Sequence, residues 1–183
     1  KIIMRVFVAI EITSDKIINS ISKFQSEINI SAKPVEPYNL HFTLQFLGEI
    51  SQEIVENVMM SLNTVKFSRF VINFKGIGVF PKLKSPRIIW IGTDEISGNS
   101  LIELAKKIEN VLTPLGFSID KPFKPHITVF RIKDKIEDIN KKLERFKSID
   151  FGTQEITCFK LKKSVLSAKG SIYFDLMEIK AES

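Results

Sequence analysis

The spacing of hydrophobic side chains changes repeatedly along the chain between the period of a strand and the period of a helix. Residues 4–12 are rich in strand-forming side chains and alternate along the backbone, which predicts a strand. The next stretch begins with the capping residues Ser14 and Asp15 and keeps apolar side chains on one face to about Asn29, which predicts a helix. The same change of period recurs to the end of the chain.

This pattern predicts two series of elements in the same order. The predicted strands are residues 4–12, 40–47, 67–79, 87–93, 124–131, 154–166 and 171–179. The predicted helices are residues 14–29, 51–65, 100–115 and 134–147. Gly48 is expected to end the second strand, and Ser51 to cap the helix after it. A turn rich in Lys and Pro at 81–86 separates the two series, so the chain resembles a degenerate duplication that closes with a hairpin.

A short motif at matching places in the two series supports the duplication. Its two copies are His41-Phe42-Thr43-Leu44 and His126-Ile127-Thr128-Val129. The chain has no other histidine. A threonine two positions after both histidines therefore indicates a repeated motif rather than a coincidence.

Strand geometry determines which side chains the first copy presents. Side chains alternate across a strand, so His41 and Thr43 share one face, while Phe42, Leu44 and Phe46 are expected on the other. The second copy presents an imidazole and a hydroxyl in the same way. If the two strands face each other across a pseudo-two-fold axis, two imidazoles and two hydroxyls converge on one point.

Such a group suits acid and base catalysis on a phosphodiester. An imidazole with a pKa of about 6.5 both accepts and donates protons near neutrality. One of His41 and His126 would deprotonate an attacking hydroxyl or water, and the other would protonate the departing oxygen. Thr43 and Thr128 would donate hydrogen bonds to the anionic phosphoryl oxygens. This chemistry requires no metal ion and no other cofactor.

Composition narrows the classes of function. With 183 residues, 44% of them hydrophobic, the chain 1–183 is expected to form a single domain with its own core. The net charge of +6 favours a polyanionic partner, although Lys160, Lys162 and Lys163 are expected to form a solvated face. No apolar run approaches the roughly 18 residues of a membrane span, and no signal peptide is visible, so a cytoplasmic protein is expected.

Other catalytic classes lack the residues they need. The single cysteine, Cys158, cannot form an internal disulfide and is expected to lie buried in a strand. Two histidines without further spaced ligands are too few for a zinc site. Gly76 and Gly78 lack the third glycine and the following helix of a dinucleotide-binding site, and no phosphate-binding loop occurs.

The two motifs and their flanking residues resemble those of the two-histidine (2H) phosphoesterase superfamily. The segments most similar to its RNA 2′,3′-cyclic phosphodiesterase branch, also called 2′-5′ RNA ligases, are MRVFVAIEI, LHFTLQFLGEI, PRIIWIG and KPHITVFR. The resemblance covers residues 4–179. It implies a bilobal α+β fold, with two mostly antiparallel sheets lining a central groove and helices outside. The pseudo-repeat lobes would be residues 4–80 and 86–183, intimately packed.

The resemblance also implies an activity. This activity is metal-independent hydrolysis of an RNA terminal 2′,3′-cyclic phosphate to a 2′-phosphate, without a cofactor. His41, Thr43, His126 and Thr128 match the catalytic residues of the family. The pseudo-symmetry makes the roles of base and acid nearly interchangeable between the two histidines. We take His41 as the general base and His126 as the general acid, which protonates the ribose 3′ oxygen.

Four further residues are candidates for substrate binding. Arg131 matches a family position suited to holding phosphate, but strict alternation places it on the buried face unless a bulge redirects it. Arg87 is a candidate either for phosphate or for capping a sheet edge. Phe46 and Tyr173 are candidates either for stacking on a base or for the core.

The same site would serve other reactions, which the sequence leaves open. One is ATP-independent joining of RNA ends, such as tRNA halves, through a 2′-5′ linkage. Others are hydrolysis of a small cyclic phosphodiester and RNA binding without catalysis. The expected partner is RNA with a 2′,3′-cyclic phosphate end, such as a tRNA fragment, with no membrane involved and the protein acting as a monomer.

Overall fold

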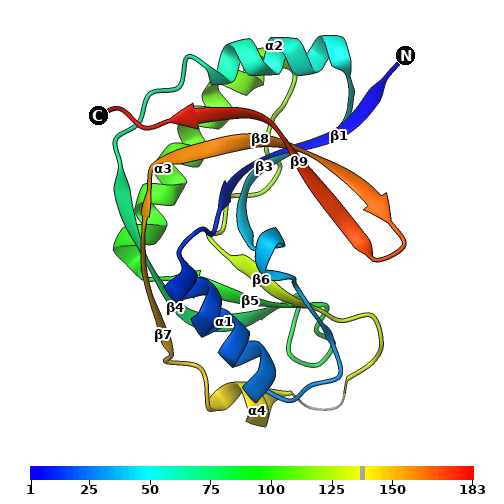
Figure 1. Cartoon of the computed structure of the whole chain (residues 1–183), viewed down its shortest axis with the longest axis vertical. Helices are drawn as coiled ribbons and strands as arrows, with labels where there is room; N and C mark the ends of the chain where they lie inside the picture. The colour runs from blue at the N-terminus through cyan, green and yellow to red at the C-terminus, as the bar shows by residue number, and fades with distance from the viewer. Residues whose placement is uncertain (137–138) are drawn as a thin grey trace.

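The computed structural model describes residues 1–136 and 139–183, which form an α+β fold built on one curled sheet (Figure 1). The strands are β1 (Ile3–Glu11), β2 (Lys33–Pro34), β3 (His41–Ser51), β4 (Phe70–Phe80), β5 (Ile88–Thr93), β6 (Ile127–Arg131), β7 (Asp150–Ile156), β8 (Cys158–Ser167) and β9 (Gly170–Lys180). The helices are α1 (Asp15–Glu27), α2 (Gln52–Leu62), α3 (Glu95–Leu112) and α4 (Asn140–Glu144), with 3₁₀ turns η1 (Pro37–Asn39) and η2 (Thr113–Leu115). The strand order is β7-β4-β5-β6-β3-β1-β8-β9, with β2 beside β6, and the named strands pair antiparallel.

Each half of the sheet combines strands from both ends of the chain. In Figure 1, β1 and β3 lie with β8 and β9 in the upper half, whereas β4, β5 and β6 lie with β7 below. The helices also cross between the halves. The helix α1 follows β1 in sequence but packs against β6 and β7, while α3 packs against α2, β3 and β4. Exchanged segments therefore tie the two halves of the sheet together.

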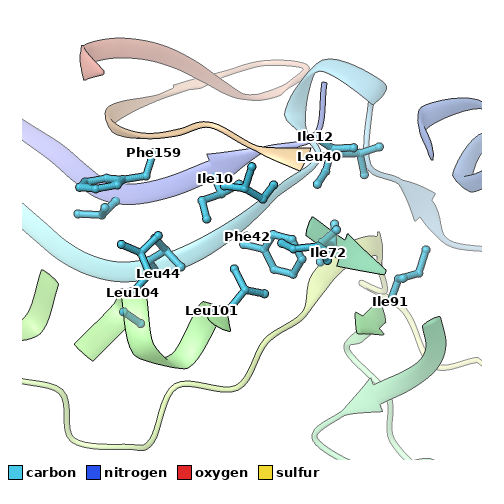
Figure 2. Packing of buried hydrophobic residues seen from close by; sticks show 14 of the residues in the cluster. Ile10, Ile12, Leu40, Phe42, Leu44, Ile72, Ile91, Leu101, Leu104 and Phe159 are labelled. Atoms are coloured by element: carbon cyan, nitrogen blue, oxygen red, sulfur yellow. The ribbon is translucent and has the colours of Figure 1, made fainter. Parts of the chain in front are cut away.

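A single residue pair joins the two halves within the sheet. In the part of the chain described, β3 and β6 pair only at Phe42 and Ile127. Both side chains are fully buried, and the ring of Phe42 stacks on Phe74 of β4 with centroids 5.8 Å apart. Figure 2 shows Phe42 in the core near Ile72 and Leu101, which belong to β4 and α3. The two sheets expected from the sequence are thus one continuous sheet, because this apolar contact holds them together.

Two boundaries in the middle of the chain differ from the sequence prediction. The strand β3 does not end at Gly48 but continues to Ser51, because Gly48 has a φ of 78° that glycine adopts while pairing with β1 continues. The helix α3 begins at Glu95 rather than at residue 100. Its start is fixed by the Asp94 carboxylate, which accepts a hydrogen bond from the Ser97 N–H at 2.9 Å.

In the C-terminal part of the chain, the structure differs from the sequence prediction in two further places. The run 154–166, predicted as one strand, contributes to both β7 and β8, which pair in opposite halves of the sheet. The chain therefore crosses between the halves at Thr157, where side-chain alternation gives no signal. The helix predicted over 134–147 is represented by α4 alone, and positions 137 and 138 of that range lie outside the described residues.

Replacing Phe42 with alanine should lower the free energy of unfolding by about 3 to 5 kcal/mol, because it removes a buried ring and leaves a cavity at the join. Denaturant titration followed by circular dichroism measures the change. Phe46→Ala is the matched control on the same strand, because Phe46 is 71% exposed, and it should stay within about 0.5 kcal/mol of the parent protein. Equal losses in the two variants would contradict the structural role of Phe42.

Candidate active site

The β3–β6 pair brings the two histidine motifs together. In an antiparallel ladder, the position before one paired residue lies opposite the position after its partner. His41 therefore lies beside Thr128, and Thr43 lies beside His126. All four side chains are half-buried, on the face away from the buried pair. The four residues predicted from the sequence thus come from two distant segments and form one cluster.

A bulge in each motif changes which residues face this cluster. The bulge in β3 lies at Leu44 and the bulge in β6 at Val129, where the register with the neighbouring strand shifts. As a result, Phe46 and Arg131 point to the same face as the histidines. The expectation that Phe46 shares the face of Phe42 is wrong, because simple alternation stops at the bulge. The bulge at Val129 provides the change of direction that Arg131 needs to leave the buried face.

Hydrogen bonds fix the protonation pattern of His41. Its Nδ1–H donates to the backbone carbonyl of Asn39 at 2.7 Å, and a carbonyl oxygen only accepts. The neutral ring therefore carries its proton on Nδ1 and a lone pair on Nε2. The Thr43 hydroxyl donates to this Nε2 at 3.0 Å. Asn39 is itself held, because its side-chain N–H donates to the carbonyl of Ser171 on β9.

His126 is oriented in the same way. Its Nδ1–H donates to the backbone carbonyl of Lys124 at 2.6 Å, again two residues before the histidine. The Nε2 atom of the neutral ring is therefore also left with its lone pair. Both imidazoles thus keep Nε2 for chemistry, and each is positioned by the chain immediately before it.

Aromatic rings and a lysine surround His126. The ring centroids of Phe80 and Trp90 lie 5.1 and 6.3 Å from that of His126. The Lys124 ammonium lies over both rings, 4.9 Å from the centroid of Phe80 and 5.4 Å from that of Trp90. Only glycine leaves room for Trp90 at position 78, because a Cβ on Gly78 would lie 2.2 Å from the indole. Sequence reasoning missed Phe80, which no motif distinguishes, and it gave Lys124, the first residue of KPHITVFR, no role in the site.

The surroundings of His41 disfavour its charged form. Burial is the largest cause, and it lowers the pKa of His41 to about 4, together with the positive charges of Lys162 and Arg131. The hydrogen bond to Asn39 and the carboxylate of Glu11 act in the opposite direction but are weaker. His41 is therefore neutral at physiological pH, which is the state of a general base.

Burial also lowers the pKa of His126 below its ordinary value of 6.5, and the charge of Lys124 adds to the effect. The hydrogen bond to the carbonyl of Lys124 acts against the shift. The two histidines therefore share an orientation but differ in their charged neighbours. His41 has two cations and one carboxylate nearby, whereas His126 has one cation.

Beside His41 lies a network of two lysines and two carboxylates. Lys162 contacts Glu11 at 2.5 Å and Asp175 at 3.0 Å, and Lys160 contacts the same two carboxylates at 2.9 and 2.7 Å. Lys162 is only 7% exposed. The expectation of a solvated lysine face is wrong for Lys160 and Lys162. Both lie on the face of β8 opposite buried Phe159 and Leu161, where each pairs with carboxylates of β1 and β9.

The remaining candidates occupy different places. Arg131 is exposed and influences the pKa of His41, and its guanidinium has no hydrogen bond or ion pair within residues 1–136 and 139–183. Arg87 donates from Nη1 to the carbonyl of Lys133 at 2.8 Å, so it ties down the chain after β6. Tyr173 on β9 packs edge-on against His41 with centroids 5.3 Å apart. The binding roles of these residues remain predictions.

Other reactive groups do not form a second centre. Cys158 is half-buried, and burial together with Glu178 raises the pKa of its thiol to about 11, so the thiol is protonated. In the described ranges, no group of three or more His, Cys, Asp or Glu side chains is arranged to hold a metal ion. No helix there is both long and apolar enough to cross a membrane.

The two halves of the chain each match the same family of proteins. The family described as LigT-like phosphoesterase matches residues 10–90 and again residues 91–173. The chain belongs to the LigT-like phosphoesterase family. The resemblance to the 2H superfamily seen in the motifs is therefore confirmed.

Relatives of known name align over most of the chain. An RNA 2′,3′-cyclic phosphodiesterase of Archaeoglobus fulgidus is 41% identical over 175 residues, covering 94% of this chain and 98% of the relative. One of Methanocaldococcus jannaschii is 37% identical over 176 residues, covering 93% and 96%. The crystal structure of a Thermus thermophilus protein matches with a TM-score of 0.81 at 27% identity over 97% of each chain. Escherichia coli LigT complexed with 3′-AMP has a TM-score of 0.80 over both whole chains at 24% identity, which shows the shared fold.

Titration of the imidazoles by NMR should show His41 changing charge at about pH 4, and His126 below pH 6.5. With only two histidines, the variant His126→Ala assigns both sets of signals. A titration of His41 near pH 6.5 would contradict its placement in a buried, cation-rich environment.

Proposed function

We propose that this protein hydrolyses the 2′,3′-cyclic phosphate at the end of an RNA to a 2′-phosphate, using two histidines. The observation that supports it most is the Phe42–Ile127 pair at the β3–β6 join, beside which His41 lies next to Thr128 and Thr43 next to His126. Two histidines that each present an unprotonated Nε2 atom are the minimum needed for concerted acid and base catalysis on one phosphorus. The relatives named RNA 2′,3′-cyclic phosphodiesterase make the cyclic phosphate the first substrate to test.

In this proposal His41 is the general base. Its pKa of about 4 keeps Nε2 unprotonated, and the Nδ1–H bond to Asn39 prevents the ring from turning away. A water molecule that gives its proton to this Nε2 attacks the phosphorus. The Thr43 hydroxyl, which donates to Nε2 in the free protein, is then released to donate to a phosphoryl oxygen.

His126 is the general acid. His126 has fewer cations around it than His41, so its imidazolium form is repelled less by neighbouring positive charge. The imidazolium donates its Nε2 proton to the ribose 3′ oxygen as the bond from that oxygen to phosphorus breaks. The product carries the phosphate on the 2′ oxygen. In each turnover His41 takes up one proton and His126 gives up one, so the number of protons on the enzyme does not change.

We propose that Thr128 and Arg131 also hold the phosphate. Arg131 faces the histidines, is exposed, and has no described partner to displace, so its guanidinium is available for two parallel hydrogen bonds. Its counterpart in the first motif is Phe46, whose exposed ring offers a stacking surface for a base. Tyr173, already packed on His41, would form the wall beside it.

The oligomeric state, the location, the kind of RNA and the domain boundaries are proposed as the sequence predicts them. We propose a monomer that acts in the cytoplasm on RNA with cyclic phosphate ends, such as tRNA fragments. We also propose a single domain over 1–183, whose pseudo-repeat lobes of residues 4–80 and 86–183 exchange strands across the sheet. Two successive matches of one family to the chain support the duplication.

Incubation with a short RNA that ends in a 2′,3′-cyclic phosphate should yield a 2′-phosphate, and EDTA should leave the rate unchanged, because two imidazoles perform the proton transfers. His41→Ala and His126→Ala should each reduce turnover by at least about 10²-fold. Chromatography of the product after nuclease digestion identifies the position of the phosphate. Loss of activity in EDTA, or near-normal turnover by either variant, would contradict the mechanism.

The pH dependence follows from the two pKa shifts. Activity requires neutral His41, so kcat/KM should rise as pH increases through about 4. It also requires charged His126, so kcat/KM should fall as pH increases through a pKa held below 6.5. The expected profile is a bell with its maximum on the acid side of neutrality. A maximum above pH 7 would contradict the proposed protonation states.

A further inference from the structure

Eight basic side chains gather at one margin of the sheet, next to the candidate site. All are exposed, and they come from four segments of the chain: Lys33, Lys82, Lys84, Arg87, Arg131, Lys133, Lys135 and Lys169. The same segments, which are residues 31–38, 81–87, 131–136 and 167–170, contain two acidic residues, Glu36 and Asp134. None of the eight basic side chains forms an ion pair within residues 1–136 and 139–183. We call these eight residues the basic surface.

Contacts between the four segments hold the basic surface together. Lys33 of β2 pairs with Arg131 of β6. The Lys33 ammonium also donates to the carbonyl of Lys169, 2.8 Å away at the tip of the β8–β9 hairpin. Arg87, at the end of the loop between β4 and β5, donates from Nη1 to the carbonyl of Lys133. Figure 1 shows the hairpin tip, the loop between β4 and β5 and the chain that leaves β6 on the same side of the molecule.

The basic surface begins at the candidate site. Residues that pair directly in an antiparallel ladder point to the same face of the sheet. Arg131, which faces the histidines, pairs with Lys33 on one side and with Ile88 on the other. Ile88 pairs in turn with Phe80, whose ring packs edge-on against His126. Lys33 therefore points to the face that carries the two histidines, and the charges continue outward from there.

Unpaired cations next to a phosphate-binding site suit a polyanion. Single-stranded RNA carries a phosphate at every nucleotide, and neutralising these phosphates with basic side chains releases bound counterions, which favours binding. Six of the eight residues are lysines, which contact phosphate as point charges and read no sequence. Tyr38, in η1 after β2, is 78% exposed and offers a ring on which a base can stack. A cyclic mononucleotide has no further phosphates to reach these charges.

We propose that the basic surface binds the sugar-phosphate backbone of the RNA that precedes the cyclic end, so that the protein prefers an RNA chain to a cyclic mononucleotide. The inference rests on the proposed function, because the histidines determine which end of the RNA lies in the site. Contacts with backbone phosphates strengthen binding to RNA of any sequence. They raise kcat/KM through binding and leave the proton transfers at the histidines unchanged.

The test compares a decamer RNA that ends in a 2′,3′-cyclic phosphate with the cyclic mononucleotide of the same base. At low salt, the parent protein should show a kcat/KM at least about tenfold higher for the decamer, because only the decamer reaches the basic surface. A variant that combines Lys33→Gln, Lys84→Gln and Lys133→Gln should lose most of this advantage through a higher KM. Its kcat/KM for the mononucleotide should equal that of the parent protein.

A matched control removes the same charge elsewhere, by combining Lys66→Gln, Lys107→Gln and Lys180→Gln. All three lysines are exposed, and Lys180 ends β9 at the opposite end from the hairpin tip. Lys107 donates to the carbonyl of Lys66, and the residue after Lys66 accepts a hydrogen bond from the chain near the C-terminus. The control should keep the preference for the decamer. Equal losses in the two variants, or equal kcat/KM of the parent protein for both substrates, would overturn the inference.

A binding measurement separates this inference from the proposed function. Fluorescence anisotropy with a labelled decamer that ends in a 2′-phosphate should show weaker binding by the variant of the basic surface. The slope of log Kd against log salt should fall by about 2, because each lysine that contacts a single strand contributes about 0.7. If neither substrate is hydrolysed but this loss is present, the proposed function fails and the RNA-binding surface stands. If the variant keeps its binding to the decamer but loses binding to anionic lipid vesicles, the surface binds a membrane and the inference is overturned.

Discussion

The site depends on one contact between two strands. Phe42 and Ile127 are the only paired residues between β3 and β6 in the described chain, and each is preceded by a histidine and followed by a threonine. Burial of this apolar pair against Phe74 fixes the separation of the two motifs. Because the pairing is antiparallel, each histidine is placed beside the threonine of the other motif. Packing on one face of the sheet therefore assembles the polar cluster on the other.

The backbone orients the two histidines in the same way, but their electrostatic surroundings differ. Each ring donates to a carbonyl two residues before it, so the geometry is repeated. The electrostatic environment is not repeated, because His41 lies near Arg131 and Lys162, whereas His126 has Lys124 alone. The ion-pair network around buried Lys162 holds that cation in place with two carboxylates. In the proposed mechanism, this unequal charge on a symmetric frame gives the two identical side chains different roles.

The sequence was informative wherever the residue pattern is local. The quartet of His and Thr, the order of the strands and helices up to residue 147 apart from the short β2, and the cap at Ser51 could all be derived from spacing and residue type. The bulges could not, because nothing in Thr-Leu-Gln-Phe distinguishes an extra residue from continued alternation. That single irregularity decides the direction of Phe46 and Arg131 and the burial of Gln45. The join between the two halves of the sheet could not be predicted either, because a contact of one residue pair leaves no periodic pattern in the sequence.

The central claim is that both histidines act on one phosphorus from opposite sides. A crystal structure with a nucleoside vanadate, whose five-coordinate metal imitates the transition state of cyclic phosphate opening, tests it most directly. The vanadate should lie between the two motifs, with Nε2 of His41 and Nε2 of His126 each about 3 Å from one of the two in-line apical oxygens. A vanadate that contacts one histidine alone, or binds away from the β3–β6 join, would contradict the account.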